Sequence, residues 1–209
     1  MAYNRKDHLY NQAKSDGYRS RASYKLIELD QKYRLFKPGS KVFDLGCWPG
    51  GWLQVASKRV GGGGRVVGVD LKETEPLPRS NVSLLHGDAK DEEILGQALS
   101  LAGGRFDLVI SDMSPKHTGI KEVDQAGTAQ VVELAYWACS QVLKPGGTLL
   151  CKAFPSGDLD RFVPELRAGF SKFQRAGLKS TRKTSKEFYI YCQGYRGTSE
   201  EYASAMQSL

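Results

Sequence analysis

The chain has 209 residues, of which 40% are hydrophobic, so it can bury one sizeable core but is short for two full domains. Thirty lysines and arginines against 23 acidic residues give a net charge of +7, a balance that favours polyanionic partners. No apolar run reaches membrane-spanning length, and the first residues are too polar for the core of a signal peptide, so we expect a cytoplasmic protein without a membrane segment.

The cysteines and histidines give no indication of a metal site. The four cysteines are widely spaced without a C-x-x-C pair, and the three histidines stand singly along the chain. We expect reduced, buried cysteines and no bound metal.

The first predicted element is a helix within residues 19–36. Ser20 can cap it, and Leu26, Leu29 and Tyr33 form an apolar stripe with Lys25 at its edge. We assign residues 1–40 to a basic N-terminal segment that contains this helix, residues 41–197 to a catalytic domain, and residues 198–209 to a polar tail.

From residue 41 onward, short apolar runs alternate with segments of helical period. The expected strands are 41–45, 65–70, 82–88, 106–112 and 148–154, followed by two late strands near 172–178 and 187–192. The expected helices are 52–60, 92–102, 124–143 and 158–170. This alternation predicts an α/β, Rossmann-like fold, with a mostly parallel sheet, helices on both faces and one antiparallel late strand.

A glycine-rich turn, with Gly46, Gly50 and Gly51, follows the first strand of the predicted sheet. Ligands of open α/β sheets bind beyond the carboxyl ends of the strands, where this turn lies. A dinucleotide fingerprint needs Gly-x-Gly-x-x-Gly, but Trp48 stands at its middle position. The spacing therefore favours a ligand without a pyrophosphate over NAD.

Four successive strands end in or at an aspartate: Asp44, Asp70, Asp88 and Asp112. Asp70 stands where an acidic side chain can accept the ribose hydroxyls of an adenosine, and Asp88 can accept the adenine amino group. Any one of them is explained as readily by capping of a turn. The series as a whole suits an adenosine that carries a cation, which points to S-adenosylmethionine as cofactor.

Lys152 lies in an otherwise apolar strand and shares one side of it with Leu150 and Phe154. Methyl transfer to a ribose hydroxyl needs a base, because the hydroxyl is a poor nucleophile at neutral pH. A lysine can serve if burial or a neighbouring cation lowers its pKa. Alternatively, a lysine near the end of a strand simply extends to solvent.

Together these motifs resemble the FtsJ family of ribose 2′-O-methyltransferases, most of all its bacterial ribosomal RNA methyltransferases. The similar segments are SRASYKL (20–26), DLGCWPGGW (44–52), GVDL (68–71), GD (87–88), SDMSP (111–115), LKPGG (143–147), CKAFPSG (151–157) and SKEFYIY (185–191). Cys47 and Trp48 depart from the pattern, because small residues are more usual there.

The resemblance implies a catalytic group of Lys25, Asp112, Lys152 and Glu187, with Lys152 as the general base. Lys25 would favour the neutral form of Lys152 and position the ribose, while the two acids would orient the lysines. Simpler alternatives stay open: Lys25 can pair with Glu28, Asp112 can cap a turn, and Glu187 can pair with Lys186. The implied cofactor-binding residues, with the first glycine of the turn, are Gly46, Gly50, Trp52, Asp70, Asp88 and Asp112.

Basic residues crowd both ends of the chain, where they can flank one RNA-binding site. The residues expected to contact RNA are Arg19, Arg21, Arg182 and Lys183. The resemblance implies a uridine of 23S ribosomal RNA, within the large ribosomal subunit, as substrate of a monomeric enzyme. Alternatives are 2′-O-methylation of transfer RNA, a non-catalytic RNA-binding module and, more distantly, an NAD oxidoreductase. The chain lacks the Asn/Asp-Pro-Pro-Tyr turn of many amine methyltransferases and the Pro-Cys of cytosine-C5 enzymes.

Overall fold

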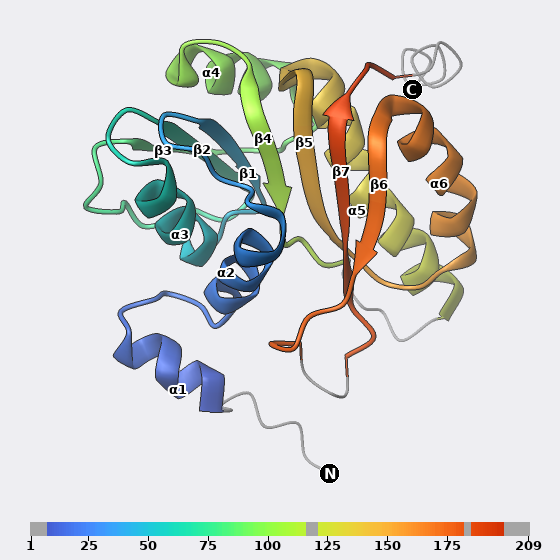
Figure 1. Cartoon of the computed structure of the whole chain (residues 1–209), viewed down its shortest axis with the longest axis horizontal. Coiled ribbons are helices and arrows are strands. Elements are labelled where there is room, and N and C mark those ends of the chain that lie inside the picture. The colour runs from blue at the N-terminus through green and yellow to red at the C-terminus, as the bar shows by residue number, and fades with distance from the viewer. Residues whose placement is uncertain (1–7, 116–120, 182–184, 199–209) are drawn as a thin grey trace.

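A computed structural model describes residues 8–115, 121–181 and 185–198, with the side chains of 121–126 excepted. Its strands are β1 (Lys41–Leu45), β2 (Arg65–Asp70), β3 (Val82–His86), β4 (Phe106–Ser111), β5 (Leu143–Ala153), β6 (Phe170–Ala176) and β7 (Phe188–Tyr195). Its helices are α1 (His8–Ser15), α2 (Ala22–Tyr33), α3 (Gly51–Val60), α4 (Glu92–Ala102), α5 (Lys121–Val142) and α6 (Gly157–Gly169). The described strands form one sheet in the order β3-β2-β1-β4-β5-β7-β6 (Figure 1).

The direction of the strands determines where loops meet. β1 pairs in parallel with β2 and β4, and β4 pairs in parallel with β5, so the carboxyl ends of these strands lie at one edge of the sheet. β7 is antiparallel to both β5 and β6. Its first residue, Phe188, pairs with Ala153 at the end of β5. The segment that precedes β7 therefore arrives at the same edge as the carboxyl ends of the parallel strands.

Helices cover both faces of the sheet (Figure 1), which confirms the predicted α/β architecture. Successive strand residues point to opposite faces, so Phe43 and Leu149 belong to the core that contains residues of α4, α5 and α6, while Val42 and Leu150 belong to the core that contains residues of α2 and α3. All four cysteines are free and buried, as expected. Among the described residues, no helix is both long enough and apolar enough to cross a membrane.

Several predicted elements begin or end one to three residues away from the observed ones. Three further differences have a clear structural reason. The helix α1 was not predicted, because only Ala13 among its residues is buried and no apolar stripe marks it. Ser20 lies one residue before the N-cap of α2, although its hydroxyl accepts the Ala22 N–H at 3.1 Å. β5 begins at Leu143 instead of Thr148, because residues 144–147 form an irregularity inside the strand where its register with β4 shifts.

Candidate active site

Lys152 and Asp112 come together because their strands are neighbours. Ser111 pairs with Cys151 in the sheet, so the residues that follow, Asp112 and Lys152, lie side by side at the carboxyl edge. Lys152 is 7% exposed, and its Nζ lies 3.2 Å from Asp112 Oδ1 and also donates to the Asp112 backbone carbonyl. The strand lysine is therefore buried in the site, and the alternative that it extends to solvent is wrong.

Tyr189 is a member of the site that the sequence analysis missed. It pairs with Lys152 across β5 and β7, and its Oη donates to Asp112 Oδ1 at 2.7 Å. Burial, followed by the Asp112 carboxylate, raises the pKa of the Tyr189 phenol well above its usual value, so it is a hydrogen-bond donor at neutral pH. The missed signal was its position two residues after Glu187, on the same side of an extended segment.

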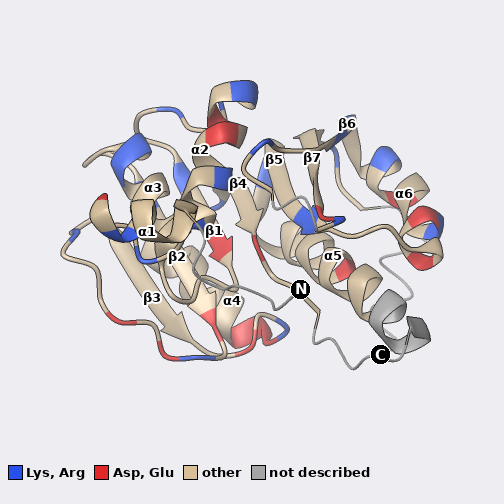
Figure 2. Ribbon diagram, turned by 90° about the horizontal axis from the view of Figure 1, so that it is seen from below, with Lys and Arg blue, Asp and Glu red and all other residues tan. Residues whose placement is uncertain are grey.

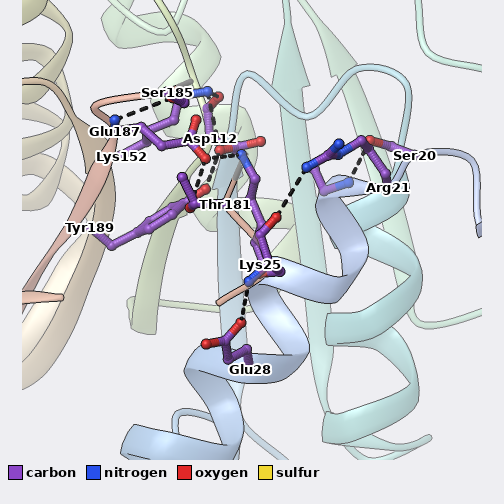
Figure 3. A network of polar contacts seen from close by, with 12 residues as sticks. Ser20, Arg21, Lys25, Glu28, Asp112, Lys152, Thr181, Ser185, Glu187 and Tyr189 are labelled. Carbon is purple, nitrogen blue, oxygen red and sulfur yellow. Dashed lines mark hydrogen bonds and ion pairs between the residues drawn. The ribbon is translucent and has the colours of Figure 1, made fainter. Parts of the chain in front are cut away.

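Lys25 reaches the site from α2 and forms an ion pair with Glu187 (Figure 3). Thr181 donates to the same carboxylate oxygen at 3.0 Å. Burial alone would raise the pKa of Glu187, but the cations of Lys25 and Lys152 and the hydrogen bonds from Lys25 and Thr181 outweigh it, and the pKa is lowered. Glu187 is thus an anion held by the two lysines of the predicted group.

The suggested pairing of Lys25 with Glu28 does not occur. Glu28 instead accepts the backbone N–H groups of Lys179 and Ser180, at 2.7 and 3.0 Å. These bonds fasten α2 to the segment before β7, and this attachment keeps Lys25 beside Glu187. All four residues of the predicted catalytic group therefore lie in one cluster of two lysines and two carboxylates, in which Tyr189 is bonded to Asp112 (Figure 3).

A second group of carboxylates lies around the glycine turn. Asp44 is 1% exposed, and in the described part of the chain its Oδ2 has no hydrogen-bond partner. Burial, then the carboxylates of Asp112 and Asp70, raises the pKa of Asp44 well above its usual value. A cavity of about 50 Å³ adjoins Asp44, Gly46, Trp52 and Asp112. This pocket gathers negative charge, which a cationic ligand can neutralise.

The glycines of the turn make room for protein side chains. Gly46 has φ 72°, and a Cβ there would overlap Cγ of Met113. Gly50 has φ 105°, and a Cβ there would lie 3.0 Å from Nη1 of Arg19. Trp52 lines the pocket, and its indole N–H donates to the Ala22 carbonyl at 2.8 Å, which joins α3 to α2. Close approach to Met113 and Arg19 is a second reason for glycine at these positions.

Asp70 and Asp88 make the turn-capping contacts that were the alternative to ligand binding. Asp70 accepts the N–H groups of Trp48 and Lys72, at 2.9 and 2.8 Å, and Asp88 accepts that of Lys90 at 2.9 Å. Each carboxylate oxygen can accept a further hydrogen bond, because it has two lone pairs. Their predicted contacts with a cofactor therefore stay compatible with these bonds and stay a prediction.

Two of the four predicted RNA contacts, Arg19 and Arg21, lie in the segment between α1 and α2. Seen from the carboxyl edge, basic segments lie around α1, α2 and α3, while acidic segments gather beside α4 (Figure 2). Arg21 donates to the Ser180 carbonyl at 3.0 Å, and Arg19 donates to three backbone carbonyls. Arg182 and Lys183 lie outside the described residues. The assignment of these four residues to RNA stays a prediction.

Comparison with known sequences identifies one family over most of the chain. Residues 18–195 match the family described as FtsJ-like methyltransferase. The chain is 43% identical over 195 residues to ribosomal RNA large subunit methyltransferase E of Pseudomonas fluorescens, which covers 93% of this chain and 92% of that protein. It is 42% identical over 197 residues to the protein of the same name from Methanothermobacter thermautotrophicus, with coverage of 94% and 93%.

Solved structures show the same fold. A crystal structure described as a ribosomal RNA methyltransferase from Plasmodium falciparum has a TM-score of 0.74 and 27% identity, and the match covers 86% of this chain and all of that one. Fibrillarin from Aeropyrum pernix, with natively bound S-adenosyl-L-methionine, has a TM-score of 0.56 and 19% identity, with coverage of 84% and 75%. The second likeness concerns the fold alone.

Proposed function

The chain belongs to the FtsJ-like methyltransferase family, and from this premise we propose that it transfers a methyl group from S-adenosylmethionine to a ribose 2′-hydroxyl of large-subunit ribosomal RNA. The proposed target nucleotide is a uridine of 23S ribosomal RNA. Residues 41–197 would act as the methyltransferase domain, and the preceding segment would contribute Lys25. We place the enzyme in the cytoplasm as a monomer.

The observation that carries the proposal is the environment of Lys152. A neutral amine has two N–H groups and one lone pair. Lys152 Nζ donates to the carbonyl oxygen of Asp112 and lies 3.2 Å from its carboxylate, so Asp112 can hold both N–H groups. The lone pair is then available to accept a proton from a ribose hydroxyl, which is the work of a general base.

The neighbours of Lys152 suit the transfer of a proton. Lys25 is held beside Glu187 in the same cluster, where it can position the ribose. Asp112 and Glu187 stabilise the ammonium that forms when Lys152 takes the hydroxyl proton. Tyr189 fixes the Asp112 carboxylate through its hydrogen bond, so the base keeps one position during the transfer.

The acidic pocket fits the proposed cofactor. S-adenosylmethionine carries a sulfonium and an ammonium, and when bound it supplies an electrophilic methyl group. Asp44 offers a buried carboxylate oxygen without a partner among the described residues, and its raised pKa reflects burial and the nearby carboxylates of Asp112 and Asp70. A bound cation would relieve this repulsion and supply the missing partner.

An acceptor assay tests the function directly. Large ribosomal subunits, small subunits and bulk transfer RNA, all from cells that lack this activity, are incubated with the protein and with S-adenosylmethionine labelled in its methyl group. We expect label in large subunits alone, and mapping of the modified ribose should locate it at the 2′-oxygen of a uridine. Preferential labelling of transfer RNA would contradict the choice of substrate, and absence of label from every RNA would contradict the function.

A further inference from the structure

Arg19 makes a set of contacts that the catalytic group does not use. Its Nη1 donates to the carbonyls of Pro49, at 3.3 Å, and Glu75, at 2.5 Å, and its Nη2 donates to that of Pro76, at 2.8 Å. Pro49 belongs to the glycine turn after β1, and Glu75 and Pro76 belong to the connection from β2 to β3. One guanidinium thus ties together the two backbone segments that flank Asp70.

The backbone around Arg19 is also fixed to α3. The Arg19 N–H donates to Oε1 of Gln54 at 2.8 Å, and Nε2 of Gln54 donates to the Gly17 carbonyl at 2.9 Å. Further along, the Ser23 hydroxyl donates to the Gly51 carbonyl at 3.0 Å. The segment 17–23 is therefore attached to the first half of α3 on both sides of Arg19. The backbone from which the Arg19 side chain extends is thus held in one position.

The glycine turn is shaped to receive this guanidinium. A Cβ at Gly50 would lie 3.0 Å from Nη1 and 3.3 Å from Cδ of Arg19, so a larger residue there would push the arginine away. Asp70 holds the same turn from another side, through the N–H of Trp48 at 2.9 Å. Arg19 and Asp70 together set the spacing between the turn and the connection that follows β2.

We propose that Arg19 is a positioning residue for the cofactor, which holds the glycine turn and the β2–β3 connection at the spacing that the adenosine requires. This inference rests on the proposed function, and it replaces the expectation that Arg19 grips an RNA phosphate. An arginine suits the task because its planar group presents donors in fixed directions toward several carbonyls, whereas a lysine is a point charge on a flexible stem. Three of its N–H donations are already engaged with the protein.

The test separates cofactor affinity from RNA affinity. Arg19→Gln and Arg19→Lys are compared with Lys14→Gln, a control that removes an exposed charge from the same basic end of the chain. Binding of S-adenosylmethionine and S-adenosylhomocysteine is measured by calorimetry without RNA. We expect affinity about tenfold weaker in Arg19→Gln, from loss of several modest hydrogen bonds, with partial recovery in Arg19→Lys and no change in the control. At saturating cofactor, the KM for ribosomal subunits should stay within about twofold of wild type, since no RNA contact would be lost.

Two outcomes would overturn the inference. Unchanged cofactor affinity with a raised RNA KM would make Arg19 a phosphate contact, and unchanged values for both would limit it to a structural role. If Arg19→Gln folds poorly, the cofactor-induced rise in Tm of Arg19→Lys gives the same comparison. Failure of the proposed function would look different, because wild-type protein itself would then bind no cofactor or methylate no RNA.

Discussion

At the carboxyl edge of the sheet, the carboxylates beside β4, β5 and β7 have different partners from those beside β1, β2 and β3. Beside β4, β5 and β7, each carboxylate meets an ammonium: Asp112 meets Lys152, and Glu187 meets Lys25. Beside β1, β2 and β3, Asp70 and Asp88 accept hydrogen bonds from backbone N–H groups, and one oxygen of Asp44 has no partner among the described residues. Paired acids hold the lysines in position, whereas acids without a cation leave a negative potential for a ligand to neutralise.

Removal of the proposed base should have the largest effect. Lys152→Ala should lower kcat by about 10²–10⁴-fold, the usual contribution of a general base, and leave the cofactor Kd nearly unchanged. Lys152→Arg should not restore turnover, because a guanidinium does not give up its proton. Lys144→Ala, which removes an exposed lysine of the same strand, is the matched control for single-turnover assays. Substantial methylation by the Arg variant would exclude proton abstraction by this residue.

Breaking the second pair should destabilise the protein in a pH-dependent way. Glu187→Gln leaves Lys25 buried without its anion, so we expect a loss near the low end of about 3–5 kcal/mol at neutral pH. The folded-state pKa of Glu187 is lowered, so its contribution is present above the unfolded value, about 4.3, and is lost as the pH falls through the folded value. Urea unfolding of both proteins at pH 7 and pH 4 should therefore show a difference that shrinks in acid. A difference that is constant with pH would contradict the ion pair.

Beside β1, β2 and β3, Asp70→Ala should weaken cofactor binding. Loss of the carboxylate would leave the ribose hydroxyls without an acceptor, and cofactor binding should weaken by about 1–3 kcal/mol. Glu73→Ala removes an exposed acid from the same connection and serves as the control. Calorimetric titration with S-adenosylmethionine measures both variants, and a wild-type Kd for the Asp70 variant would remove this residue from the cofactor site.

The smallest effect, and the one opposite in sign to that of Glu187, is expected at Asp44. Its pKa is raised by burial and by the carboxylates of Asp112 and Asp70, so its ionisation destabilises the free protein as the pH rises through the folded value. At a pH where Asp44 is ionised, Asp44→Asn should raise the Tm of the free protein by about 2–4 °C, the shift that corresponds to about 1 kcal/mol in a chain of this size. The variant should also lose part of the Tm rise that S-adenosylmethionine gives to wild type. A lower Tm without ligand would show that the Asp44 carboxylate stabilises the free fold.

The regular parts of the fold were predictable because their signals are local. β1, β2 and α4 begin and end where the apolar pattern and the flanking turns placed them. α1 was not, because its residues carry no periodic apolar face, and the irregularity in β5 was not, because it depends on register with β4. Ser20 was displaced by one residue because Arg21 occupies the N-cap position.

The candidate site also has parts that could be predicted from the sequence and parts that could not. Similar motifs indicated Lys25, Asp112, Lys152 and Glu187, and the sheet brings them together. Contacts between segments that are distant in the chain could not be predicted from the sequence. Tyr189, for example, reaches Asp112 only because β7 pairs antiparallel with β5. The assignment of Arg19 to RNA rested on charge and stays a prediction. The donations of its guanidinium to three backbone carbonyls could not be predicted from composition, because they depend on segments far away in the sequence.

The position of β7 has a consequence for synthesis of the enzyme. A nascent chain emerges from the ribosome with its N-terminus first, so β1 to β5 can pair while β7 is still inside the exit tunnel. In the finished sheet, β7 lies between β5 and β6. Until then β5 presents an unpaired edge, and Lys25 and Lys152 are without Glu187 and Tyr189. Because β7 follows the other described strands in the chain, closure of this gap makes assembly of the candidate site a late step in the folding of this sheet. A nascent chain halted before Phe188 would lack β7 and Tyr189, so we expect it to be inactive.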